Sequence, residues 1–103
     1  MSRRRPVANR DRNHPEIVAA LRAIGCTVVD LAAVGGGVPD LLVGYRGRNL
    51  LVEVKDGSVS PSRRQLRETQ VQFRTDWRGQ WSMVTDVAGA VELAQAVGRG
   101  GQW

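Results

Sequence analysis

The stretch VPDLLVGYRGRNLLVEVKDG, residues 38–57, decides the fold because it predicts two apolar strands and the turn between them. We expect the strands over Leu41–Tyr45 and Arg48–Lys55, with Arg46-Gly47 as a two-residue hairpin turn. Such a turn fixes the register, because Tyr45 then pairs with Arg48. Each residue further back along the first strand faces one residue further along the second strand, so Asp40 faces Glu53.

Three polar residues gather at one end of this hairpin. Directly opposed residues share a face, with Cβ atoms about 4.5–5.5 Å apart. Lys55 lies two residues beyond Glu53 and therefore points to the same side as Glu53 and Asp40. The other face of the two strands is apolar and carries Leu41, Val43, Val52 and Val54.

Two facing carboxylates repel each other when both are ionised, and a divalent cation between them removes that cost. Carboxylate oxygens together with water and phosphate suit Mg²⁺ or Mn²⁺. Of the 15 Lys and Arg residues only Lys55 is a lysine, which favours a specific need for an ammonium group there. The alternative is a buried ion pair between Lys55 and one of the acids at the end of a sheet.

The remaining sequence predicts an α/β fold in which helices flank a mixed sheet of about four strands. We expect a flexible Arg-rich arm over 1–12, one domain over 13–97 and a flexible tail over 98–103. Within the domain, the order is helix, strand, strand, strand, helix, strand and a short final helix. The predicted ranges outside the hairpin are a helix over 13–25, a strand of about five residues starting near Cys26, a glycine loop, a polar loop over 56–64, a helix over 66–78, a strand over 80–86 and a helix over 87–97.

Composition and charge indicate the compartment of the protein and the kind of partner it binds. The chain has 103 residues, no apolar run near 18 residues and no secretory signal in its basic N-terminal segment, so we expect no membrane association. The lone Cys26, expected in the core, excludes an internal disulfide and fits a reducing compartment, hence the cytoplasm. The net charge of +5 favours a polyanionic partner such as nucleic acid, although a basic soluble protein without such a partner is the simpler alternative.

Pro39-Asp40, followed on the next strand by Glu53-Val54-Lys55, resembles the motif of the PD-(D/E)XK nuclease superfamily. The setting, GGGVPDLLVG, a hairpin and LLVEVKDG between two helices, is similar to the VRR-NUC branch, which includes small phage proteins. The resemblance covers about 13–84. It implies a restriction-endonuclease-like core with the order α-β-β-β-α-β.

The resemblance also assigns roles to individual residues. It implies that Asp40, Glu53 and the backbone carbonyl of Val54 bind metal and that Lys55 is catalytic. The family acid on the first helix matches Glu16, although Asn13-x-x-Glu16 also resembles a capping box. A catalytic Gln on the second long helix matches Gln70, but LRETQ stands where the family has Thr-Pro, so Gln72 is a second candidate. His14, the only histidine, is expected at the surface and excludes a zinc–histidine cluster.

The function implied by the resemblance is that of a Mg²⁺- or Mn²⁺-dependent DNA endonuclease. In-line hydrolysis would leave a 5′-phosphate, and stand-alone members are similar to Holliday junction resolvases that act on branched DNA as homodimers. Sequence-independent phosphate contacts are expected from Arg3, Arg4, Arg5, Arg46, Arg48, Arg63 and Arg64. The alternative is a non-catalytic nucleic-acid-binding module that retains the nuclease fold.

Overall fold

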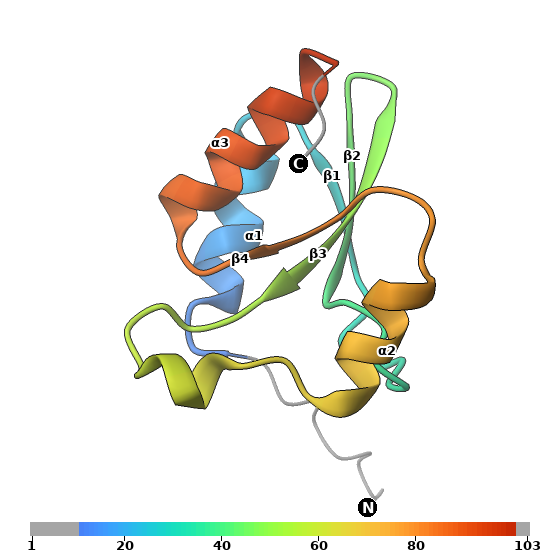
Figure 1. Cartoon of the computed structure of the whole chain (residues 1–103). Helices are drawn as coiled ribbons and strands as arrows, with labels where there is room; N and C mark the ends of the chain where they lie inside the picture. Colours follow the sequence, from blue (N-terminus) through green and yellow to red (C-terminus); the bar gives the residue numbers. More distant parts are fainter. Residues whose placement is uncertain (1–10, 101–103) are drawn as a thin grey trace, which may run out of the picture.

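The computed structural model describes residues 11–100 and confirms an α/β fold built on one mixed four-stranded sheet. Figure 1 shows the sheet between a pair of helices on one face and a single helix on the other. The strand order is β1-β2-β3-β4, with β1–β2 and β2–β3 antiparallel and β3–β4 parallel. The elements are α1 (His14–Ala23), β1 (Thr27–Asp30), β2 (Leu41–Tyr45), β3 (Arg48–Val54), the 3₁₀ helix η1 (Pro61–Arg64), α2 (Glu68–Asp76), β4 (Trp81–Val84) and α3 (Val87–Gly98).

The predicted element order is confirmed, and the differences lie at the boundaries. Helix α2 begins at Glu68, two residues later than expected, and part of the expected polar loop forms η1. Helix α3 continues through Gly98, which was expected in the tail. Most of the expected arm and tail lies outside the described residues. The end of the arm is described, and there Arg12 Nη2 donates to Ser58 Oγ at 2.9 Å. No helix within the described range is long and apolar enough to cross a bilayer.

The turn between β2 and β3 has the conformation that the sequence predicted. Arg46 has φ +52° and Gly47 has φ +80°, and two successive positive φ angles are the signature of the type I′ turn that joins strands in register. Tyr45 therefore pairs with Arg48, and Leu41 pairs with Val52. The antiparallel register continues without a bulge along the whole length of β2.

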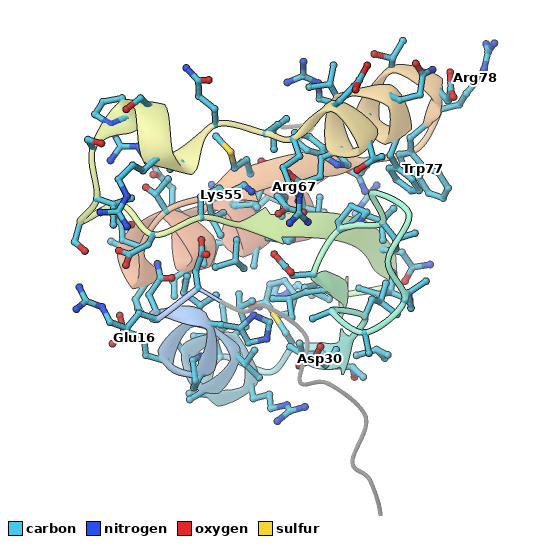
Figure 2. All side chains as sticks on the ribbon, turned by 90° about the horizontal axis from the view of Figure 1, so that it is seen from below. Glu16, Asp30, Lys55, Arg67, Trp77 and Arg78 are labelled. Carbon is cyan, nitrogen blue, oxygen red and sulfur yellow. The ribbon has the colours of Figure 1, made fainter. Side chains whose placement is uncertain are left out.

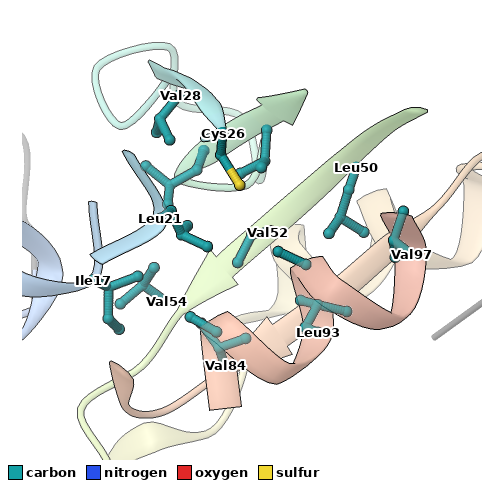
Figure 3. Close-up of a cluster of buried hydrophobic side chains, with 14 residues drawn as sticks. Ile17, Leu21, Cys26, Val28, Leu50, Val52, Val54, Val84, Leu93 and Val97 are labelled. Atoms are coloured by element: carbon teal, nitrogen blue, oxygen red, sulfur yellow. The ribbon is translucent and has the colours of Figure 1, made fainter. Parts of the chain in front are cut away.

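One face of this sheet forms the hydrophobic core. Helices α1 and α3 contact each other and cover that face, as Figure 3 shows for Ile17 and Leu21 of α1 and Leu93 and Val97 of α3. Cys26 also belongs to this cluster and is buried, as expected. The strand residues predicted for the apolar face are all at most 2% exposed: Leu41, Val43, Val52 and Val54.

The opposite face of the sheet is covered in part by α2, which is held against the glycine loop before β2. A Cβ atom on Gly37 would overlap the backbone oxygen of Thr69, so only glycine allows the loop to approach α2 this closely. Gly36 also has a positive φ, of +67°, but its missing Cβ would face open space. The close approach at Gly37 therefore sets the position of α2 above the sheet.

Gly37→Ala should destabilise the protein more than the matched control Gly36→Ala. Both substitutions place a side chain at positive φ, which costs about 1–2 kcal/mol. Gly37→Ala adds a clash with Thr69, for which we expect about 1–3 kcal/mol more. Urea unfolding of both variants measures the difference, and equal midpoints would show that the contact at Gly37 does not hold α2.

Candidate active site

Asp40 and Glu53 meet at the end of the sheet where β2 begins and β3 ends. The observed register, continued by one pair beyond Leu41–Val52, places Asp40 opposite Glu53. Asp40 Oδ2 accepts a hydrogen bond of 2.8 Å from the backbone N–H of Val54, which fixes the carboxylate beside the last residue of β3. The predicted juxtaposition of the two acids is therefore confirmed.

Lys55 and Gln70 complete a hydrogen-bonded group around Glu53. Lys55 Nζ lies 3.4 Å from Glu53 Oε2 and donates to Gln70 Oε1 at 3.0 Å. Gln70 Nε2 donates to the same Glu53 oxygen at 2.9 Å. Glu53 is 3% exposed and Gln70 is 5% exposed, so these polar groups satisfy one another out of contact with bulk water.

The structure also separates the two candidate glutamines. Gln70 is the third residue of α2, and its Oε1 additionally accepts a 2.8 Å bond from the backbone N–H of Arg67 at the start of the helix. Gln72 instead donates to Asp76 Oδ2 at 3.0 Å on the exposed side of α2. Only Gln70 therefore contacts the group around Glu53. Figure 2 shows Lys55 and Arg67 on the α2 side of the sheet.

The two carboxyl groups do not titrate normally. Burial, and next the neighbouring charge of Asp40, raise the pKa of Glu53 from 4.5 to about 7, against the opposing effect of Lys55. Burial also raises the pKa of Asp40, while the hydrogen bond from Val54 and the charges of His14 and Lys55 oppose the increase. Burial therefore disfavours the charged form of both acids, and the charge of Asp40 disfavours that of Glu53 further.

The donor set fits a hard divalent cation bound together with substrate. Among residues 11–100, no three side chains of His, Cys, Asp or Glu converge as metal ligands, which is unlike a closed structural zinc site. Mg²⁺ is commonly held by one or two carboxylates, with waters and substrate phosphates completing its shell. Asp40 and Glu53 supply that pair of carboxylates, and a cation would offset the repulsion that raises the pKa of Glu53.

Glu16 is not part of this group. It is exposed and lines a separate hollow with residues that include Arg12, Asn13 and Asp56. The buried face of α1 carries His14, Ile17 and Leu21, and Glu16 is rotated by about 200° from His14 at 100° per residue. In Figure 2, Glu16 accordingly lies beside α1, away from the side of the sheet that α2 covers.

The capping box that Asn13 and Glu16 were expected to resemble does not form. Asn13 precedes α1 but makes no side-chain capping bond. Its Nδ2 instead donates to the backbone oxygens of Lys55 and Thr85, at 3.2 and 2.8 Å. Asn13 therefore ties the start of α1 to the ends of β3 and β4, immediately beside the residue that carries the ammonium group.

His14 was expected at the surface, and the structure corrects this. It is 3% exposed, and its Nε2 lies 3.1 Å from Asp30 Oδ2. The charge of His14 also opposes the increase in the pKa of Asp40, so α1 contributes to the electrostatics of this acid. The available signal was its spacing, since His14 lies three residues before Ile17 and seven before Leu21 on the apolar stripe.

The predicted arginines occupy different environments. Arg46 and Arg48 are exposed at the hairpin tip, and Arg63 is exposed in η1. Arg64 has a structural contact, because its Nη1 donates to the backbone oxygens of Gly57 and Val59 at 2.8 and 2.9 Å and so braces the loop after β3. The predicted contacts of residues 3–5 lie outside the part of the chain that the structure describes.

No protein-family model matches the chain, and neither a curated protein nor a solved structure matches it. The function is therefore inferred from the residues of the site and their geometry.

Glu53→Gln should change how stability depends on pH. Glu53 ionises near pH 4.5 in the unfolded chain and near pH 7 in the folded chain, so the stability of the wild type falls as the pH rises between these values. The loss amounts to about 2 kcal/mol after allowance for solvent screening. The glutamine variant has no titrating group at this position and should lose none of this stability.

Urea unfolding of both proteins from pH 4.5 to pH 8, in the presence of chelator, measures this difference. The matched control is Glu16→Gln, which removes an exposed carboxylate. Its free energy of unfolding, plotted against pH, should run parallel to that of the wild type. If the wild-type and Glu53→Gln profiles are also parallel, the raised pKa of Glu53 is refuted.

Proposed function

We propose that this chain is a Mg²⁺- or Mn²⁺-dependent endodeoxyribonuclease that hydrolyses phosphodiester bonds, with selectivity for branched DNA. The observation that carries the proposal is a buried group beside Asp40, in which Gln70 is hydrogen bonded to both Glu53 and Lys55 and Lys55 forms an ion pair with Glu53. An ion pair formed only for stability would need one acid and one base. The second buried acid adds repulsion, which a nuclease uses to bind a cation.

Asp40 and Glu53 would hold the ion, with the backbone carbonyl of Val54 as a further proposed ligand between them. When bound, such an ion lowers the pKa of a coordinated water and offsets charge that develops on the phosphate. The resemblance to the PD-(D/E)XK superfamily, and to its VRR-NUC branch, gives these residues the same roles and supports a restriction-endonuclease-like core.

Lys55 is oriented by two partners: its Nζ donates a hydrogen bond to Gln70 Oε1 and forms an ion pair with Glu53. An ammonium group has three N–H donors, so these two contacts leave at least one. The third donor is then available for a non-bridging oxygen of the scissile phosphate or for the attacking water. The water oxygen forms the new bond to phosphorus, the bond from phosphorus to O3′ breaks, and the products carry a 5′-phosphate and a 3′-hydroxyl. Helix α2 fixes the position of Gln70, and Gln70 in turn holds the ammonium group of Lys55 in place.

The substrate and assembly follow from charge and resemblance. A net charge of +5 favours phosphate contacts and a binding affinity that falls steeply with salt. Cleavage of two strands at a junction requires two sites, which a homodimer would supply. A cytoplasmic site of action belongs to the same proposal. The second candidate, a non-catalytic DNA-binding module, is favoured only by exposed arginines such as Arg46 and Arg48 that lie remote from the acids.

Asp40→Asn and Lys55→Ala should each lower the cleavage rate by about 10²-fold or more, because each removes a charge that acts on the transition state. Gln70→Ala should lower the rate by about 10-fold or more, since Lys55 loses its positioning partner. The matched control Gln72→Ala removes the same side chain from the exposed side of α2 and should retain the wild-type rate. Initial rates on a four-way junction and on a linear duplex of equal length, with Mg²⁺, Mn²⁺ or chelator, measure these effects.

Asp40→Asn should keep its thermal unfolding midpoint near or above that of the wild type, because it removes repulsion between the two acids. Lys55→Ala and Gln70→Ala should lower the midpoint, because each leaves the buried Glu53 with one partner fewer. Cleavage rates are therefore compared below the lowest midpoint, which separates lost chemistry from lost folding. DNA binding that persists with no cleavage under either metal would refute the nuclease proposal and favour the binding module.

A further inference from the structure

Three arginines from separate segments meet at the end of the molecule remote from the acids. Arg46 lies in the hairpin turn, Arg48 begins β3 and Arg99 directly follows α3, and all three are exposed. Figure 1 shows the hairpin tip and the last turn of α3 at the same end of the molecule, with α2 at the other end. A shallow hollow of about 290 Å³ is lined there by Tyr45, Arg46, Gln95, Gly98 and Arg99.

Close packing holds this cluster together. A Cβ atom on Gly98 would lie 2.7 Å from Tyr45 Cδ2 and 3.2 Å from Arg46 Cδ, so the hairpin tip touches the helix at a point where only glycine fits. The guanidinium carbon of Arg46 lies 5.4 Å from the centroid of the Tyr45 ring. Arg48 Nη2 would lie 3.4 Å from a Cβ atom on Gly100. The backbone segments that carry the three cations are therefore held side by side.

Capping of α3 does not explain the cluster. Arginines near a helix C-terminus often bond its last carbonyls, but here backbone groups do so. Arg99 N donates to the oxygens of Gln95 and Ala96, and Gly100 N donates to that of Val97. In the described chain, none of the three guanidinium groups belongs to a salt bridge or side-chain hydrogen bond, which leaves five N–H donors on each.

We propose that Arg46, Arg48 and Arg99 form an anchoring site for backbone phosphates of a duplex DNA arm. A guanidinium group can donate two parallel hydrogen bonds to the oxygens of one phosphate. Neighbouring cations that have no acid among the described residues as an ion-pair partner repel one another, and a bound anion offsets that repulsion. The strand from Asp40 to Arg46 spans about 20 Å at about 3.3 Å per residue. At about 3.4 Å per base pair, the anchored phosphates lie about six base pairs from the cut.

The position relative to the cut rests on the proposed nuclease function, whereas the anchor itself does not. A substrate that engages both sites needs a duplex arm of at least about six base pairs. Mononucleotides and very short arms would reach only one of the two sites. The distance between the two sites therefore sets a minimum length for the duplex arm of the DNA substrate.

The test compares the wild type with the triple variant Arg46→Gln, Arg48→Gln, Arg99→Gln. Fluorescence anisotropy with a labelled duplex of about 20 base pairs, in chelator so that no cleavage intervenes, gives the affinity as a function of KCl. The slope of log K against log salt should become shallower by about 2–3, because each lost phosphate contact removes about 0.9. The matched control replaces the same three arginines by lysine and should retain most of the slope, because the charges remain.

A second measurement locates the anchor. Neutral methylphosphonate linkages placed about six base pairs from the cut should weaken binding of the wild type and leave binding of the glutamine triple variant unchanged. Circular dichroism confirms that both triple variants are folded. An unchanged salt slope in the glutamine variant overturns the proposal. Binding to phosphatidylserine vesicles is measured in parallel. If the glutamine variant loses binding to the vesicles but not to DNA, the cluster binds a membrane surface and the proposal is also overturned.

The two proposals fail separately. A shallower slope without cleavage under any metal would support the anchor and refute the nuclease, whereas cleavage with an unchanged slope would refute the anchor alone.

Discussion

The type I′ turn at Arg46-Gly47 is the constraint on which the site depends. Both residues adopt positive φ, and this local geometry joins β2 and β3 in one register. That register places Asp40 opposite Glu53 and Lys55 on the same face. Because side chains alternate along a strand, a slip of one residue would turn the acids toward the core and the core valines toward α2. The hydrophobic face and the polar face thus specify the same register.

The acid pair carries a cost that the rest of the fold offsets. Two carboxyl groups lie largely out of water, and burial, followed by the charge of Asp40, raises the pKa of Glu53. Gln70 and Lys55 bond the more buried of them, and Val54 donates to the other. Helix α2 brings Gln70 into place although it buries few apolar side chains, and the contact at Gly37 supports it. Part of the stability of α2 therefore comes from the site itself.

Local sequence signals were sufficient to predict the hairpin and its register. They were insufficient where packing between distant segments determines the position of a residue. The turn, the pairing and the face of Lys55 followed from residues close together in the chain. Gln70 was identified from the family resemblance, but its choice over Gln72 needed the observed start of α2. His14 was expected at the surface but is buried, because the rotation of α1 is set by packing of Ile17 and Leu21 against the sheet and α3. The same rotation leaves Glu16 exposed. The contacts of Asn13 with Lys55 and Thr85 join segments 42 and 72 residues apart, for which the sequence holds no local signal.

The function proposed for this chain requires that Asp40 and Glu53 form one cation site. Anomalous diffraction from a crystal soaked in Mn²⁺ tests this requirement most directly. We predict a peak about 2.1 Å from carboxylate oxygens of both Asp40 and Glu53, and no peak at Glu16. A Mn²⁺ peak elsewhere with none between these two residues, or carboxylates that turn away from each other, would contradict it.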